Sequence, residues 1–258
     1  MEIHILASGS TGNAALFKFG NTTLLVDTGI SARRIEQGMA EVGLKAGDLD
    51  GILISHEHND HVKGLDVLVR RHQIPVFTRA KTWQELPCRH NFLPKSCFEI
   101  AQEFSIGPVG INAFNISHDA ADPVGFSFSY KKKKVVMLTD LGVVSSRVEK
   151  VLEGADAAVI EANHDLDMLE NGPYPRFLKQ RIKSSSGHLS NVHAGRLLAR
   201  LRCQPEMRIF LAHLSQHNNH PDLAEKTVAN FLSNSGYQVG RDIYLYRTFP
   251  NHRSSISL

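Results

Sequence analysis

Three histidines and an aspartate fall within six residues, at the spacing H-x-H-x-D-H, in the stretch from His56 to His61. Imidazole rings at this density repel one another when charged, and a buried loop gains nothing from them when they are neutral. Histidines that merely cap a helix and face water would not need this spacing. A bound cation explains it, because imidazole nitrogens and carboxylate oxygens are common metal ligands. The stretch therefore predicts a metal site.

The residues on either side predict the elements that carry this loop. The run Gly51 to Ile54 is short and apolar, as in a buried strand. After the loop, apolar residues recur at the spacing of one helix face from Val62 to His72. The metal site is therefore expected on a loop between a strand and a helix.

Four further apolar runs each lead into a side chain that carries chemistry. They are 109–116, which leads into His118; 135–138, which leads into Asp140; 157–160, which leads into Glu161; and 209–212, which leads into His213. Strands that all end in His, Asp or Glu indicate a site built at one edge of a sheet assembly. This shared pattern carries more weight than any one of the residues.

Asp27 ends another apolar run, Thr23 to Val26, and is followed two residues later by Gly29. A carboxylate in this place is suited to accept a hydrogen bond from a metal-bound histidine, as a second-shell residue. It is equally typical of an ordinary turn aspartate. The sequence leaves both interpretations open.

Length and composition set the class of protein. At 258 residues the chain is long enough to bury roughly three quarters of its unfolded surface, and we predict a single domain over 1–258 with a poorly ordered tail at 251–258. Helical spacing at 145–152, 191–202 and 221–235, together with the strands, favours an α/β fold with two sheets face to face and helices outside. The three cysteines have no metal spacing and are expected to be reduced thiols.

Charge and hydropathy limit the surroundings and the partners. No apolar stretch reaches the roughly 18 residues of a membrane span, and the chain opens directly into a strand pattern, so a cytoplasmic protein without membrane contact is expected. A net charge of +3 permits contact with nucleic acid without arguing for it. The run Lys131 to Lys134 lies between two strand patterns and is interpreted as a solvated hairpin turn.

The order and spacing of these motifs resemble the metallo-β-lactamase superfamily. The features that match are the H-x-H-x-D-H motif, the preceding Asp27-Thr-Gly, and the later His118, Asp140 and His213. Within that superfamily, four further motifs are similar to the YycJ/WalJ group, which is close to ribonuclease Z and the phosphodiesterase PhnP. They are Ser8-Gly-Ser-Thr-Gly-Asn13, Glu161-Ala-Asn-His-Asp165, Gly187-His-Leu-Ser-Asn191 and His213-Leu-Ser-Gln-His-Asn-Asn219. The resemblance covers nearly the whole chain.

The resemblance implies a four-layer αββα sandwich, the metallo-β-lactamase fold, with two divalent ions, zinc or manganese. One ion would be held by His56, His58 and His118, the other by Asp60, His61 and His213, and Asp140 would bridge them. Two cations about 4 Å apart lower the pKa of a shared water and neutralise charge that builds on a phosphoryl group.

His188 separates the hydrolases of this superfamily from one another. Gly187-His188-Leu-Ser-Asn opens the helix expected at 191–202, so its imidazole would lie beside a helix N-terminus that attracts anions. The resemblance implies that His188 contacts the phosphate and protonates the leaving oxygen, and it makes Asp60 and His188 the catalytic residues. His164 and Asn219 are further candidates for substrate binding; a helix-flanking His188 and a packed His164 are the plain structural alternatives.

The resemblance implies a phosphodiester hydrolase, most specifically a DNA exonuclease that acts from the 5′ end towards the 3′ end. A small-molecule phosphodiesterase of the PhnP kind is the nearest alternative. A thioesterase, lactonase or β-lactamase would leave the His188 motif unexplained, and a non-catalytic regulator would not need all seven ligands. A polymer substrate requires a basic groove, for which the candidates are Arg33, Arg34, Arg176, Lys179, Arg181 and Lys183. An oligomer is compatible with the sequence.

Overall fold

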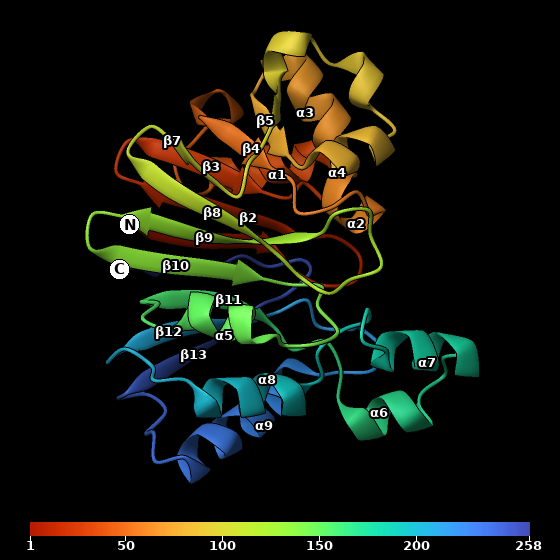
Figure 1. Ribbon diagram of the computed structural model, residues 1–258, viewed down its shortest axis with the longest axis vertical. Coiled ribbons are helices and arrows are strands. Elements are labelled where there is room, and N and C mark those ends of the chain that lie inside the picture. The colour runs from red at the N-terminus through yellow and green to blue at the C-terminus, as the bar shows by residue number, and fades with distance from the viewer. The chain divides into compact units, whose positions relative to one another are not determined.

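The computed structural model describes residues 1–258 and shows two compact units. The first unit contains residues 1–113, 120–124 and 250–258, and the second contains residues 114–119 and 125–249. Figure 1 colours the chain by residue number, from red at the N-terminus to blue at the C-terminus. That the whole chain forms a single domain stays a prediction. None of its helices is long and apolar enough to cross a membrane.

A seven-stranded sheet is the framework of the first unit, with its strands in the order β14-β1-β2-β3-β4-β5-β6. Strands β14, β1, β2 and β3 pair antiparallel, and β3 to β6 pair parallel. The strands are β1 (Glu2–Ala7), β2 (Ala14–Phe19), β3 (Thr22–Val26), β4 (Gly51–Leu53), β5 (Val76–Thr78), β6 (Cys97–Glu99) and β14 (Ser254–Ser257).

Short helices connect these strands and share a hydrophobic core with them. They are α1 (Ala32–Ala40), α2 (Asn59–Val62), α3 (Leu65–His72), α4 (Ala80–Glu85) and the 3₁₀ turns Ala46–Asp48, Arg89–Asn91 and Pro94–Ser96. The side chain of Ser31 caps α1 by accepting a hydrogen bond from the amide of Arg34. Trp83 on α4 is buried in this core, as packing requires. An antiparallel pair, β7 (Glu103–Ile106) and β8 (Val109–Asn115), leads on towards the second unit.

The helix expected from Val62 to His72 is in fact two helices, α2 and α3, which are separated at Gly64. The amide of Gly64 donates to the carbonyl of Thr28 at 2.7 Å. A Cβ atom at this position would lie 2.3 Å from the carbonyl oxygen of Ile30. The chain therefore turns here so that its backbone can press against the loop that follows β3.

The tail also differs from the expectation that residues 251–258 are poorly ordered. Residues Ser254–Ser257 form β14, which pairs with β1 so that Ile256 lies opposite Ile3. Ile256 is buried, and the hydroxyl of Ser255 is hydrogen-bonded to Nδ1 of His4 at 2.8 Å. A single apolar residue among serines has no detectable period, so the strand depends on a partner at the other end of the chain.

Five strands of the second unit follow one another in the order β9-β10-β11-β12-β13. They are β9 (Val124–Tyr130), β10 (Lys133–Leu138), β11 (Ala157–Glu161), β12 (Met207–Ala212) and β13 (Ile243–Arg247). Strands β9 and β10 form the hairpin expected at the lysine run, with Lys131 in the left-handed conformation of its turn. From β10 to β13 the strands are parallel.

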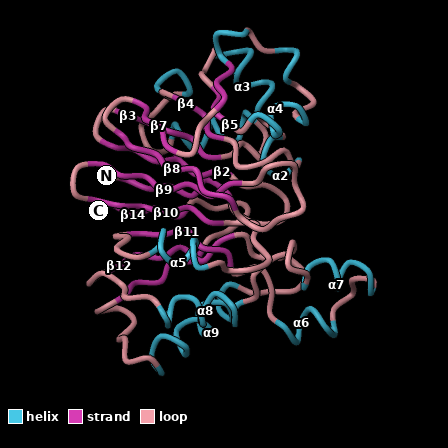
Figure 2. The backbone as a smooth tube through the Cα atoms, in the orientation of Figure 1, coloured by secondary structure: helices cyan, strands magenta, loops and turns pink.

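Parallel strands need crossover connections, and helices supply them here. These are α5 (Ser146–Leu152), α6 (Leu166–Asn171), α7 (Arg176–Lys183), α8 (Asn191–Arg200) and α9 (Pro221–Asn234). Figure 1 shows α5, α8 and α9 beside β11 to β13, and their apolar faces share one core with these strands, as in Val148, Leu198 and Val228. In Figure 2 the cyan helices α6 and α7 project from the loops that follow the strands.

Register brings the carboxyl ends of these strands level with one another. Leu138 lies opposite Ile160, and Glu161 lies opposite Ala212. Side chains that follow β10, β11 and β12 therefore meet at one edge of the sheet, which is the usual place for a site in parallel α/β structure.

Candidate metal centre

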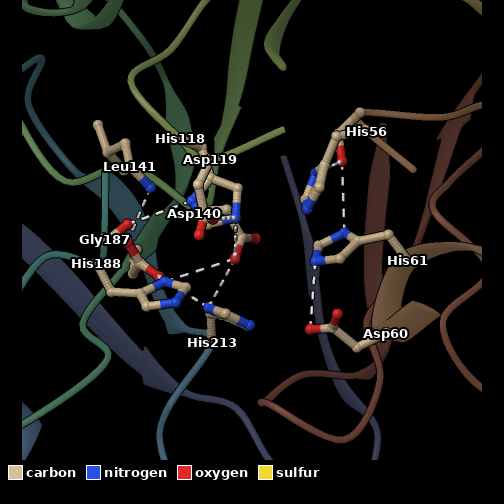
Figure 3. Close-up of polar contacts among 12 residues, drawn as sticks. His56, Asp60, His61, His118, Asp119, Asp140, Leu141, Gly187, His188 and His213 are labelled. Carbon is tan, nitrogen blue, oxygen red and sulfur yellow. Dashed lines mark hydrogen bonds and ion pairs between the residues drawn. The ribbon is translucent and has the colours of Figure 1, made fainter. Parts of the chain in front are cut away.

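In the first unit, the H-x-H-x-D-H motif lies where the sequence predicts, on the loop after β4 and the start of α2. His56 and His61 are fully buried, and Asp60 is half-buried. The ring of His56 lies 4.1 Å from that of His61 and 4.7 Å from that of His58, between centroids. Figure 3 shows His56, His61 and Asp60 arranged along this loop.

Asp27 is hydrogen-bonded to two residues of this loop, Ser55 and His61. It is completely buried, and its Oδ2 accepts a hydrogen bond from Nδ1 of His61 at 2.8 Å. Its Oδ1 accepts from the amide of Ser55 at 2.9 Å, and the Ser55 hydroxyl, 3.0 Å from Nδ1 of His56, also contacts both carboxylate oxygens. Asp27 thus accepts hydrogen bonds from His61 and Ser55 and ties the loop to the end of β3, and its role beside a metal-bound histidine stays a prediction.

Glu161 has the corresponding place in the second unit, as the last residue of β11. Its side chain is fully buried, and its Oε1 lies 2.8 Å from Nδ1 of His188 and 2.7 Å from Nδ1 of His213. A carboxylate accepts hydrogen bonds only, so both imidazoles donate from Nδ1. The other oxygen, Oε2, accepts from the amides of Leu141 at 3.1 Å and Leu189 at 2.9 Å. One carboxylate thus joins the segments that carry Asp140, His188 and His213.

The imidazoles of the second unit are close together. The ring centroid of His188 lies 5.1 Å from that of His213 and 5.3 Å from that of His118, and Figure 3 shows His188 and His213 beside Asp140. Nδ1 of His118 donates to the carbonyl of Ser186 at 3.1 Å. Ser186 belongs to the loop from Ser184 to Gly187, which leads directly into His188. The same loop therefore positions both His118 and His188.

Burial and charge act in opposite directions on these groups. Burial lowers the pKa of His188, but the neighbouring carboxylate of Glu161 more than offsets it, so the pKa of His188 is raised. Burial would raise the pKa of Glu161, but His188 and His213 lower it, and Glu161 is an anion. Burial lowers the pKa of His118, which favours its neutral ring.

Three of these residues have a strained backbone. Asp27, Asp140 and His213 have φ angles of 59°, 59° and 56°, in the left-handed region that residues other than glycine rarely adopt. Each follows the end of a strand, β3, β10 or β12. Strain of this kind is typical of functional sites, where it turns a side chain in a direction that a regular strand end does not allow.

The second unit gathers carboxylates and imidazoles, the kinds of side chain that bind divalent metals. One potential ligand atom from each of Asp140, Glu161, His188 and His213 lies within 4.8 Å of the others. Because His118 and His213 donate from Nδ1, Nε2 is the nitrogen without a proton in their neutral rings, as cation binding requires. His61 in the first unit also donates from Nδ1, and its Nε2 lies 3.3 Å from the side-chain nitrogen of Asn13. Nitrogen and oxygen ligands without a thiolate suit zinc or manganese.

Two residues expected at the substrate have internal contacts. The amide of Asn219 is paired with that of Asn191 at 2.9 Å and donates to the carbonyl of Ala162 at 2.8 Å. His164 is 2% exposed, and its carbonyl accepts from the amide of Asn191 at 2.9 Å. Both residues hold the start of α8 against the end of β11, and a direct contact of either with substrate stays a prediction.

Several cations expected to line a groove are already paired. Arg34 donates to the carbonyl of Pro250 at 2.6 Å, Arg181 is paired with Asp119 at 2.6 Å, and Lys179 donates to the carbonyl of Glu170 at 2.6 Å. Lys183 is paired with the carboxylate of Glu170. The charges of Arg181 and Lys183 are therefore partly neutralised by carboxylates, whereas Arg34 and Lys179, which donate to carbonyls, keep theirs.

The comparisons with known proteins agree with this geometry. A family model described as a beta-lactamase superfamily domain matches residues 22–214. Exodeoxyribonuclease YycJ of Bacillus anthracis is 37% identical over 259 aligned positions, which cover 99% of this chain and 98% of YycJ. Exodeoxyribonuclease WalJ of Streptococcus pneumoniae serotype 2 is 40% identical over 253 positions, which cover 96% of this chain and 94% of WalJ.

A solved structure shares the fold of this chain. The metallo-β-lactamase fold protein YhfI from Bacillus subtilis superimposes with a TM-score of 0.72 over 98% of each chain, at 19% identity. This likeness confirms the fold class expected from the sequence, the α/β metallo-β-lactamase fold. The resemblance to the YycJ/WalJ group is confirmed as well, by relatives of nearly full length. The chain therefore belongs to the beta-lactamase superfamily, among the relatives of the exodeoxyribonucleases YycJ and WalJ.

Proposed function

We propose that this chain is a metal-dependent phosphodiester hydrolase that acts on DNA as an exonuclease, from the 5′ end towards the 3′ end. Its relatives named exodeoxyribonucleases match nearly its whole length and support this proposal. The structural observation that carries it is the pairing of His188 and His213 with one buried carboxylate, Glu161. This pairing supplies a proton donor next to a metal-binding histidine.

The fold implies divalent metal, and we infer that seven side chains hold two ions, zinc or manganese. The proposed ligands are His56, His58 and His118 for one ion, Asp60, His61 and His213 for the other, and Asp140 for both. When bound, such ions lower the pKa of a water and neutralise negative charge on a phosphate. The hydrogen bonds from Nδ1 of His61, His118 and His213 support the assignment, because a metal-binding histidine commonly donates its other ring N–H to a carboxylate or a carbonyl.

The catalytic residues are His188 and Asp60 in this proposal. Nδ1 of His188 is occupied by Glu161, so Nε2 is the atom that presents a proton to the leaving oxygen. The anionic Glu161 stabilises the imidazolium form from which that proton comes. Asp60 offers a carboxylate to accept a proton from the attacking water. Bond cleavage then needs no free thiol or hydroxyl nucleophile from the chain.

End-labelled substrates test the function. Purified protein with added Mn²⁺ or Zn²⁺ is incubated with linear DNA and linear RNA labelled at either end, with circular single-stranded DNA, and with bis(p-nitrophenyl) phosphate. We expect mononucleotides or short products released from the 5′ end of linear DNA, no cleavage of the circle, and complete loss of activity in EDTA.

Other results would lead to other functions. Hydrolysis of bis(p-nitrophenyl) phosphate alone would make the chain a small-molecule phosphodiesterase, and cleavage of the circle at a comparable rate would make it an endonuclease. Faster degradation of RNA than of DNA would reject the proposed substrate while leaving the metal centre in place.

A further inference from the structure

The second unit contains a cavity of about 400 Å³ beside α8, outside the groups assigned to the metal centre. Its lining has two parts of different chemistry. Val143, Val144 and Leu189 form an apolar part, and His193, Arg196 and Arg200, together with Lys183, form a basic part. The volume lies within the range of small-molecule sites, which combine apolar walls with a few polar groups.

Most of the basic part is one face of α8, and Lys183, on α7, is paired with Glu170. His193, Arg196 and Arg200 follow one another at intervals of three and four residues along α8, which places their side chains in one row. All three are exposed. Arg200 is paired with Glu149 at 2.9 Å, so its charge is partly neutralised.

Arg196 and His193 have no acidic partner. The guanidinium of Arg196 lies 6.0 Å from the ring centroid of Phe231, and neither residue belongs to any ion pair. Burial lowers the pKa of His193, and the charge of Arg196 lowers it further, with no carboxylate acting in the other direction. Arg196 thus faces the cavity as a cation without a carboxylate partner, beside a His193 ring whose neutral form is favoured, and an anion in the cavity would pair with the guanidinium.

The cavity is lined in part by residues close in sequence to Asp140 and His188. Gly142, two residues after Asp140, and Ser184 and Ser185, just before His188, line it. The amide of Gly142 donates to the carbonyl of Ser117 at 2.8 Å, and the Ser117 hydroxyl donates to the carbonyl of Ser185 at 2.5 Å. A Cβ atom on Gly142 would lie 2.3 Å from that carbonyl oxygen, so the two loops are in direct contact.

We propose that this cavity binds a nucleotide of the substrate strand beyond the bond that is cut, with its phosphate on His193, Arg196 and Arg200. The sugar or base lies against Val143, Val144 and Leu189. Guanidinium groups bind phosphate oxygens with paired hydrogen bonds, which suits a row of two arginines. The inference rests on the proposed action on DNA. It would also explain why the enzyme prefers polymers to small diesters, because only a polymer can fill this cavity as well as the site of cleavage.

Equilibrium binding without metal tests the cavity separately from catalysis. A 12-nucleotide single-stranded DNA with a 5′ phosphate and a 3′ fluorophore is titrated with metal-free protein in EDTA over a series of salt concentrations. We expect Arg196→Gln to raise Kd at least fivefold at low salt and to make the log–log salt slope shallower by about one. Arg202→Gln, at an exposed arginine just beyond α8 that does not line the cavity, should stay within twofold of the unmodified protein.

A variant of the apolar part gives an independent result. Val144→Glu introduces a negative charge opposite the arginines, and it should weaken DNA binding at least as much as Arg196→Gln. Unchanged Kd and salt slope in both variants would overturn the proposal. Equal dependence of polyglutamate binding on Arg196, at similar affinity, would also overturn it in favour of an acidic protein partner.

The two proposals fail in different ways. Protein that binds the oligonucleotide through Arg196 but never cleaves DNA with Mn²⁺ or Zn²⁺ would reject the exonuclease and keep the cavity as a nucleotide site. Protein that cleaves DNA from its end, with binding and rate unaffected by Arg196→Gln and Val144→Glu, would keep the exonuclease and reject the cavity.

Discussion

Glu161 holds three segments of the candidate site in place. Four hydrogen bonds end on its carboxylate, two from imidazoles and two from amides that follow Asp140 and His188 in sequence. Such partners orient metal-binding histidines and the groups around them. Its action on the reaction is therefore indirect, through the rings that it positions.

Glu161→Gln should lower kcat on linear DNA by roughly 10- to 100-fold and weaken metal binding by a similar factor. Both imidazoles donate to Oε1 and two backbone amides donate to Oε2, so the NH₂ of a glutamine faces donors whichever way the amide is turned, and one of these pairs of hydrogen bonds is lost. Turnover and metal content are measured on the same samples. Glu99→Gln, at an exposed glutamate that also ends a strand, is the control and should change neither quantity. Full activity in Glu161→Gln would remove its positioning role.

His188→Asn should keep the bound metal while turnover on DNA falls by roughly 10² to 10⁴, the usual size of a lost general acid. The loss should be smaller for bis(p-nitrophenyl) phosphate, because nitrophenolate leaves without a proton. Rates on both substrates and metal content by mass spectrometry decide the role. Metal loss would make His188 a ligand, and equal rate losses would limit it to binding phosphate. His90→Asn, at an exposed histidine, is the control.

Single site residues could be predicted from the sequence where they lie close together along the chain. The motif from His56 to His61 lies within one loop, so its chemistry is visible in six letters. Glu161 was recognised only as an acid at a strand end, because its partners at Leu141, His188 and His213 come from three separate segments. The spacing of apolar residues does not show that these three segments meet at Glu161.

Among the elements, the loop after β3 and the start of α2 come into contact at Gly29. Its amide donates to the carbonyl of Asn13 at 2.7 Å. A Cβ atom on Gly29 would lie 1.6 Å from the carbonyl oxygen of Asp60. Only glycine allows the backbone that carries Asp60 to approach so closely.

Gly29→Ala should therefore destabilise the protein by about 1–3 kcal/mol, the usual cost of overpacking a tight contact. It should also weaken metal binding, because Asp60 is displaced with its backbone. Urea unfolding and metal titration measure the two effects. Gly47→Ala, with nothing within 4 Å of the added Cβ, is the matched control and should leave both unchanged. Equal stability of the two variants would contradict the contact.

Strands and helices were predictable where they form their own pattern and less so elsewhere. The apolar strands and the helices α8 and α9 follow from period, and they agree with the structure within two residues. The break between α2 and α3 depends on the contact of Gly64 with the loop after β3, and β14 depends on β1 at the opposite end of the chain. Both the break and the strand depend on tertiary contacts, which the spacing of residues within one segment does not reveal.

For the whole molecule, the fold class was predictable because several strands end in site residues and their order along the chain is specific. Stability against acid is a further whole-molecule property, and His164 contributes to it. This ring is 2% exposed, and burial lowers its pKa from 6.5 to about 4. The unfolded chain therefore takes up a proton near pH 6.5 while the folded protein does not, so stability falls as the pH drops from 6.5 towards 4.

His164→Gln should remove this part of the pH dependence. Between pH 7.5 and 5.0 the free energy of unfolding of the unmodified protein should fall by about 2 kcal/mol more than that of the variant, from a folded pKa of about 4. Urea unfolding of metal-free samples at both pH values gives the difference. Parallel decreases in the two proteins would show that His164 is protonated as easily in the folded protein as in the unfolded chain.

The left-handed backbone at Asp27, Asp140 and His213 also restricts which sequences evolution or a random library can reach. Asparagine and glycine enter this conformation readily, whereas other residues lose roughly 1–2 kcal/mol each and branched side chains lose more. Variants that survive at these three positions should therefore be rich in Asn, Asp and Gly even when selection is for folding alone. An inactive descendant of this protein would then keep the appearance of a polar site long after it had lost its chemistry.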